Sequence, residues 1–268
     1  EKRVSVIDKS ILKEKPVIEI DYCIIKLFSA DDEEKHYFRV KEILKNISNT
    51  LHNSDLVEIY INLTNYCNRN INAGKKNFRK EKFELYKDEN KLKLCILKGY
   101  MQPIYYKNLV ILALSLDEYK WVKEFISEYK NELPEDSKEN IYSYCMALYE
   151  FDLKEFDRAI EQLSKIKYDE LYLKYDSKIL QLMIYYETGE EEALISSLEA
   201  FRHFLTNNKL LPENKKELYT NFYRFFSRIF TAKMKEDKTE LGRIKKSISP
   251  DVNIFNKEWL IRKLDEQI

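Results

Sequence analysis

Glycine and proline are scarce in this sequence, which has only 4 glycines and 5 prolines among 268 residues. Sheet proteins need turn residues about every 8–12 positions, so the shortage argues against a sandwich or a barrel. Long charged helices need few such residues, and charged side chains make up 34% of the chain. We therefore expect an all-α fold before any periodicity is considered.

Signatures of catalysis and of ligand binding are also missing. The three histidines, His36, His52 and His203, lie far apart and form no HExxH pattern, so they do not predict a metal site. Neither of the glycine-rich phosphate loops, GxxxxGK[ST] or GxGxxG, occurs. Acidic residues are plentiful, but no pair stands out as an acid and a base. We predict that the chain is not an enzyme and carries no metal and no cofactor.

The cysteines are few and isolated. Cys23, Cys67, Cys95 and Cys145 stand among apolar neighbours without a CxxC pair, which predicts buried free thiols. Free thiols are typical of a reducing compartment such as the cytoplasm. No apolar run reaches the roughly 18 residues that cross a bilayer. We expect a soluble, cytoplasmic protein without membrane insertion.

Charge is balanced overall but unevenly distributed. The net charge is +5 over residues 1–115, −11 over 116–200 and +6 over 201–268. A neutral total disfavours a dedicated nucleic-acid binder. A basic cluster still leaves that alternative open, and it consists of Arg69, Lys75, Lys76, Arg79, Lys80 and Lys82, with Phe78 among them.

Apolar residues recur at spacings of three and four through most of the chain, as in amphipathic helices. Gly74 stands where a helix C-terminus favours positive φ. After a loose lead-in over residues 1–15, we predict helices at about 17–28, 33–51, 54–73, 78–90, 213–235 and 240–247, with an extension of the fourth to 97 left open, and a final amphipathic helix that contains Trp259 and Leu260.

A weak internal repeat begins after Pro103. The segment 116–122 matches 153–159 at an offset of 37 residues, and Ala193 follows Ala159 by a further 34. Periods of this length are typical of stacked helix hairpins. The matching positions are Val110, Tyr119, Val122, Ile126 and Pro134 in the first unit, Ala147, Phe156, Ala159 and Leu163 in the second, and Gly189 and Ala193 in the third.

These residues resemble a degenerate tetratricopeptide repeat over about residues 100–207, and the run from Ile179 to Pro212 is similar to uncharacterised bacterial helical-repeat proteins that carry no known activity. The resemblance implies an α-α superhelix, a right-handed stack of about six antiparallel helix hairpins. We predict one helical-repeat domain over 1–268, with N-terminal hairpins at 16–99 and a C-terminal helical cap at 208–268. Such caps keep a repeat array soluble. Because the sequence begins with Glu1 and not with an initiator methionine, we also expect it to be a fragment of a longer protein.

In tetratricopeptide arrays the first helix of each hairpin lines a groove that takes peptides. The resemblance therefore implies a protein-binding scaffold or adaptor. Two alternatives remain open: a regulatory or structural region of a longer protein whose activity lies before Glu1, and self-association. The predicted groove residues are Ile104, Lys107, Ile141, Tyr144, Tyr175 and Lys178.

A second docking face is predicted in the C-terminal cap, where aromatic residues surround most of one helix. Either both sides of this helix are packed in the core or one side anchors a partner. The residues in question are Phe222, Tyr223, Phe226 and Phe230.

Overall fold

The computed structural model describes residues 15–29, 34–167, 171–207, 210–248 and 252–268. Over these residues the fold is all-α apart from one short strand pair, which confirms the predicted class. The chain divides into two compact units, residues 1–145 and 146–268, with the boundary inside a helix of the segment predicted to resemble tetratricopeptide repeats. The predicted lead-in, apart from Lys15, lies outside the described residues.

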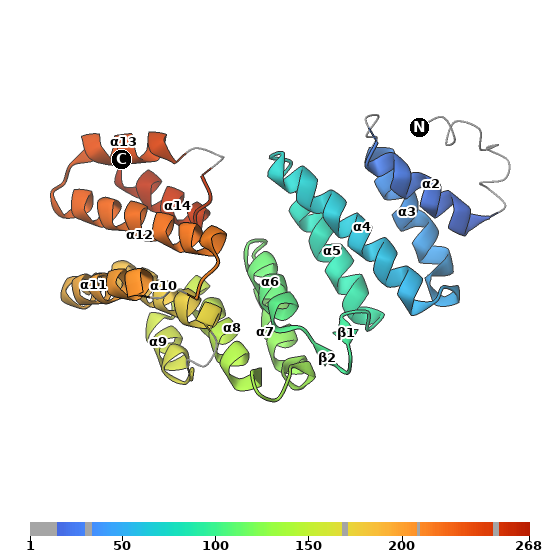
Figure 1. Cartoon of the computed structure of the whole chain (residues 1–268), viewed down its shortest axis with the longest axis horizontal. Coiled ribbons are helices and arrows are strands. Elements are labelled where there is room, and N and C mark those ends of the chain that lie inside the picture. The colour runs from blue at the N-terminus through green and yellow to red at the C-terminus, as the bar shows by residue number, and fades with distance from the viewer. Residues whose placement is uncertain (1–14, 30–33, 168–170, 208–209, 249–251) are drawn as a thin grey trace. The chain divides into compact units, whose positions relative to one another are not determined.

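The N-terminal unit is built from helix pairs in which consecutive helices contact each other (Figure 1). The pairs are α2 (Pro16–Leu27) with α3 (Glu34–Ile47), α4 (Asn53–Asn72) with α5 (Asn77–Lys91), and α6 (Pro103–Leu114) with α7 (Tyr119–Glu128). Short 3-10 turns follow α3 and α7 at Ser48–Thr50 and Lys130–Glu132. Helix α8 (Lys138–Asp152) starts in this unit and crosses the boundary.

The C-terminal unit continues the pattern of neighbouring helices in contact. Helix α10 lies against α9 and α11, and α12 contacts α11, α13 and α14 (Figure 1). The bounds are α9 (Phe156–Ser164), α10 (Leu171–Thr188), α11 (Glu191–Asn207), α12 (Glu213–Met234), α13 (Lys238–Ser247) and α14 (Lys257–Gln267). Most predicted helices are therefore present, with ends within a few residues of the expected ones.

An aromatic cluster fixes the first two helix pairs of the N-terminal unit together. The rings of Tyr37 and Tyr66 stack at 5.3 Å between centroids, and Phe78 packs edge-on against both. All three side chains are fully buried. Burial of each contributes roughly 1.5–3 kcal/mol. The Cys67 thiol donates to the Tyr37 hydroxyl at 3.4 Å, and that hydroxyl donates to Glu81 at 3.2 Å, so the buried Tyr37 hydroxyl is paired.

Helix ends in this chain are built largely without glycine. Gly74 does adopt the expected positive φ, +86°, after α4. The equivalent position after α5, α6, α8 and α12 is filled by Lys93, Asp117, Lys154 and Glu236, each at a φ between +53° and +63°. In every case the next residue's N–H bonds back to the carbonyl five positions earlier, as in a Schellman motif. Main-chain hydrogen bonds thus end these helices, which explains how the chain folds with so few glycines.

A two-residue β-hairpin joins α5 to α6. Strands β1 (Ile96–Leu97) and β2 (Tyr100–Met101) pair antiparallel around Lys98 and Gly99, which have φ of +55° and +87°. These angles fit a two-residue turn of type I′. The sequence predicts only a helix break here, because two residues per strand are too few for an alternating pattern to be recognised.

Candidate functional site

The predicted groove residues do not form one exposed row. In the N-terminal unit Ile104 is exposed and Lys107 is partly buried, but Ile141 and Tyr144 are 3% and 1% exposed. In the C-terminal unit Tyr175 is fully buried. The expectation that Ile141, Tyr144 and Tyr175 face a partner is therefore wrong.

The physical reason lies in α8 and α10, which bury side chains around most of their circumference. Both helices are covered on more than one side, so few of their apolar residues are left for a groove. Lys178 on α10 is partly buried with its ammonium 5.5 Å from the Phe204 ring centroid, and burial followed by the charge of Lys174 lowers its pKa.

The aromatic residues of α12 are mainly core residues as well. Phe222 and Phe226 are fully buried and Phe230 is 8% exposed, whereas Tyr223 is partly buried. The Phe226 ring lies 5.5 Å from Trp259 on α14. Of the two alternatives, packing on both sides of α12 is the one observed for the three phenylalanines, and they are not a docking face.

Helix α6 is the part of the predicted groove that does present apolar side chains outward. Ile104 and Ile111 are 58% and 42% exposed, and Asn108 is exposed between them. With Lys107 they occupy positions i, i+3, i+4 and i+7, which lie on one side of a helix. We call these four residues the α6 outer face. The opposite side is buried and carries Tyr106, Leu109, Val110 and Ala113.

A hydrogen-bonded pair holds the N-terminal turn of α6 against α5. The Tyr105 hydroxyl donates to Oε2 of Glu89 at 3.1 Å, and the Tyr105 ring packs edge-on against Tyr86 at 5.0 Å. The ammonium of Lys82 lies 5.5 Å from the Tyr86 ring centroid. Burial raises the pKa of Glu89 to about 7, against the opposing effects of the Tyr105 hydrogen bond and the Lys82 charge, and burial lowers the pKa of Lys82.

Further contacts fix α6 on its inner side. The Tyr106 hydroxyl donates to the Ile126 carbonyl of α7 at 2.7 Å, in the buried core. The Lys107 ammonium lies 5.9 Å from the centroid of the Tyr144 ring, on the part of α8 that belongs to this unit. The α6 outer face is therefore carried by a helix that is anchored to three neighbours.

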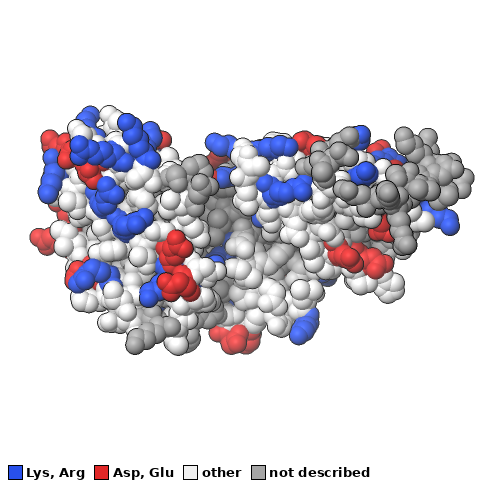
Figure 2. Space-filling view, turned by 45° about the horizontal axis from the view of Figure 1, so that its top comes forward, with Lys and Arg blue, Asp and Glu red and all other residues white. Residues whose placement is uncertain are grey.

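The predicted basic cluster is mostly engaged within the N-terminal unit. Phe78 is buried in the aromatic cluster, so it offers no ring to a base. Arg69 donates to the Leu27 carbonyl at 2.5 Å, and Lys75 pairs with Glu34 at 3.7 Å. Lys76 and Lys80 remain exposed. In Figure 2 basic, acidic and uncharged side chains are interspersed over the face that it draws, so this view gives no support for a broad basic surface.

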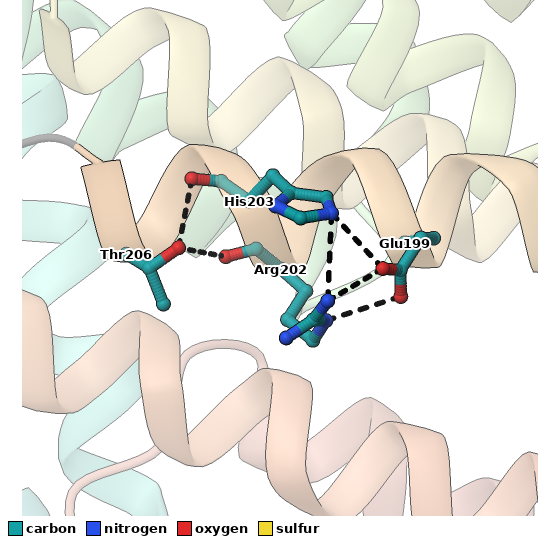
Figure 3. A network of polar contacts seen from close by, with 4 residues as sticks. All are labelled: Glu199, Arg202, His203 and Thr206. Atoms are coloured by element: carbon teal, nitrogen blue, oxygen red, sulfur yellow. Dashed lines mark hydrogen bonds and ion pairs between the residues drawn. The ribbon is translucent and has the colours of Figure 1, made fainter.

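A polar network on α11 contains one of the three histidines (Figure 3). Arg202 donates two hydrogen bonds to Glu199, at 2.6 and 3.1 Å, and His203 Nε2 lies 3.0 Å from the same carboxylate. The Arg202 hydrogen bond lowers the pKa of Glu199. All three side chains are about half exposed. Exposed pairs of this spacing stabilise a helix by only about 0.2–0.5 kcal/mol, and the network is best explained as a solvated helix side.

Among the described residues, no group of three or more His, Cys, Asp and Glu side chains is arranged to hold a metal ion. Every helix in the described ranges is too short or too polar to cross a membrane.

Comparison of the chain with protein-family models, with curated proteins and with solved structures finds no match.

Sequence reasoning did not identify every residue of this site, for reasons that the structure explains. Ile111 and Asn108 share a helix side with Ile104. Helix α6 carries apolar residues on every side, more than one buried side requires, and this pattern could have indicated an exposed apolar side. No sequence pattern pointed to Glu89, because its raised pKa depends on burial beside Tyr105, sixteen residues away in the chain.

Proposed function

We propose that this chain is a non-catalytic binding scaffold that takes a partner protein on the α6 outer face. The observation that supports the proposal is the exposure of Ile104 and Ile111 on a helix that is otherwise packed into its unit. Single exposed apolar residues are ordinary on protein surfaces. Two isoleucines two turns apart on one helix side are the pattern by which helices present anchors to a partner.

Rigidity supports the same function. Binding a partner costs conformational entropy, and less of it when the binding surface is already ordered. Tyr105 and Tyr106 tie α6 to α5 and α7 by hydrogen bonds, so the outer face is held in place before any partner arrives. The resemblance to tetratricopeptide repeats agrees with this role and adds no further residue to it.

The test is affinity capture with the chain as bait, in extract of its source cells, comparing two double variants. Ile104→Asp with Ile111→Asp places two charges on the α6 outer face. The matched control is Ile61→Asp with Ile195→Asp, because these isoleucines are 52% and 56% exposed on α4 and α11. Circular dichroism and thermal unfolding establish that both variants are folded.

We expect at least one protein to be captured stoichiometrically by the wild type and by the control, and to be lost with the α6 variant. Retention of every captured protein by the folded α6 variant would contradict the proposed site.

A further inference from the structure

The segment that leads into α6 and forms it contains no acidic residue. From Asn90 to Leu116 there is neither Asp nor Glu, whereas Lys91, Lys93, Lys98 and Lys107 all lie within it. The chain as a whole has equal numbers of basic and acidic residues, 46 of each. A stretch of this length with one sign of charge therefore departs from the composition of its surroundings.

Two of these lysines have no partner within the described residues. Lys93 and Lys98 are exposed, and no carboxylate there lies within ion-pairing distance of either. Some other lysines do pair with a carboxylate, such as Lys87 with Glu84 at 3.0 Å and Lys130 with Glu139 at 2.8 Å. The two unpaired charges stand at the end of α5 and at the tip of the β-hairpin, just before α6.

Both lysines also occupy a backbone conformation that does not favour them. Each has a φ of +55°, where a residue with a Cβ costs about 1–2 kcal/mol relative to glycine. Asparagine is the usual alternative at such positions. Charge thus stands at positive φ at these two sites, as it also does at Asp117, Lys154 and Glu236.

Exposed apolar side chains accompany the lysines. Leu97 in β1 is 47% exposed, and Ile104 and Ile111 follow on α6. A partner that covers this surface needs apolar side chains for the isoleucines and carboxylates for the lysines, because unpaired charges at an interface lose solvation without compensation.

A helical partner fits this surface better than an extended one. Ile104 and Ile111 are seven residues apart, about 10 Å along α6, which matches two turns of a second helix packed against it. Strand addition needs an open sheet edge, and the strands here have only two residues each.

Resting on the function proposed above, we infer that the α6 outer face, together with Lys93 and Lys98, binds an acidic amphipathic helix of a partner protein. The apolar stripe of that helix covers Ile104 and Ile111. Its carboxylates lie toward the α5 end and the hairpin tip.

The probes are three fluorescent peptides with the same leucine stripe at i, i+3, i+4 and i+7 and with Glu, Gln or Lys at all remaining positions. Fluorescence polarisation with the whole chain measures their affinities. We expect the Glu peptide to bind roughly tenfold or more tightly than the Lys peptide, and its affinity to fall as salt is raised.

The decisive variant is Lys93→Asn with Lys98→Asn. It removes two charges while keeping residues that tolerate positive φ, so the fold should be at least as stable as the wild type. Lys154→Asn is the matched control, because Lys154 is also exposed at positive φ, +63°, but lies in the other unit. We expect roughly fivefold weaker binding of the Glu peptide by the double variant and unchanged binding by the control.

Three results would overturn the inference: equal binding of the Glu and Lys peptides, no effect of the Lys93 and Lys98 variant, or no binding of the Glu peptide. A fourth is stronger, lysine-dependent binding to vesicles of anionic lipid than to the Glu peptide, which would assign the surface to a membrane. If the α6 variant still loses a captured natural partner while the Glu peptide fails to bind, the proposed function stands and only the acidic helix is excluded.

Discussion

Tyr105 on α6 and Glu89 on α5 are joined by a hydrogen bond of 3.1 Å from the phenol to the carboxylate. The carboxylate is largely withdrawn from water, and burial raises its pKa from 4.5 in the unfolded chain to about 7. The link between these two helices therefore contains a group that titrates close to neutral pH.

This titration predicts a pH dependence of stability. Between about pH 4.5 and 7 the folded chain binds a proton at Glu89 that the unfolded chain does not, so its contribution to stability rises as pH falls through that window. Glu89→Gln should remove this component and stabilise the fold at pH 8 by about 1–3 kcal/mol. Urea unfolding at pH 5, 6, 7 and 8 measures both effects. Glu84→Gln, at the surface of the same helix, is the control, and identical pH profiles for the two variants would contradict the assignment.

Two stacked tyrosines in the C-terminal unit give a paired prediction. The rings of Tyr175 and Tyr219 lie 4.8 Å apart, but only the Tyr219 hydroxyl is bonded, to the buried carboxylate of Asp176 at 2.7 Å. The Tyr175 hydroxyl is buried with no hydrogen-bond partner among the described residues. Tyr219→Phe should cost about 1–3 kcal/mol, whereas Tyr175→Phe should be neutral or stabilising. Urea unfolding of both variants decides, and an equal loss would show that the hydroxyls are equivalent.

The helix ends predict stabilising substitutions. Glu236 follows α12 at a φ of +53°, while its neighbour Lys235 has a φ of −95°. Glu236→Gly should stabilise the chain by about 0.5–1 kcal/mol, because glycine adopts positive φ without steric cost. Lys235→Gly serves as the control and should be destabilising, since it only adds freedom to the unfolded chain. Thermal unfolding measures both, and destabilisation by Glu236→Gly would refute the explanation.

The thiols predict slow chemical modification. All four cysteines are buried and free, as the sequence predicts. Burial raises the pKa of Cys23, Cys67 and Cys95 to about 11 and that of Cys145 further. Little reactive thiolate is then present at pH 8. Mass spectrometry after iodoacetamide treatment should find almost no modification of the native chain and four modified thiols in denaturant. Rapid modification of any native cysteine would show that the segment around it opens locally.

Sequence reasoning succeeded where the information is local. Helical periodicity placed most helices, and Gly74 marked a helix end correctly, because both depend on residues a few positions apart. It failed for Ile141, Tyr144 and Tyr175, whose burial depends on which neighbours cover α8 and α10. A resemblance to a repeat family predicts on which side of a helix a residue lies. It does not predict whether another element packs against that side.

The glycine-poor helix ends also show what sets the direction of the chain after a helix. Four of its turns are specified by main-chain hydrogen bonds and by the sign of one dihedral angle, with lysine, aspartate or glutamate at the position where glycine is usual. The direction in which the chain leaves each of these four helices therefore depends on its backbone and does not require one residue type.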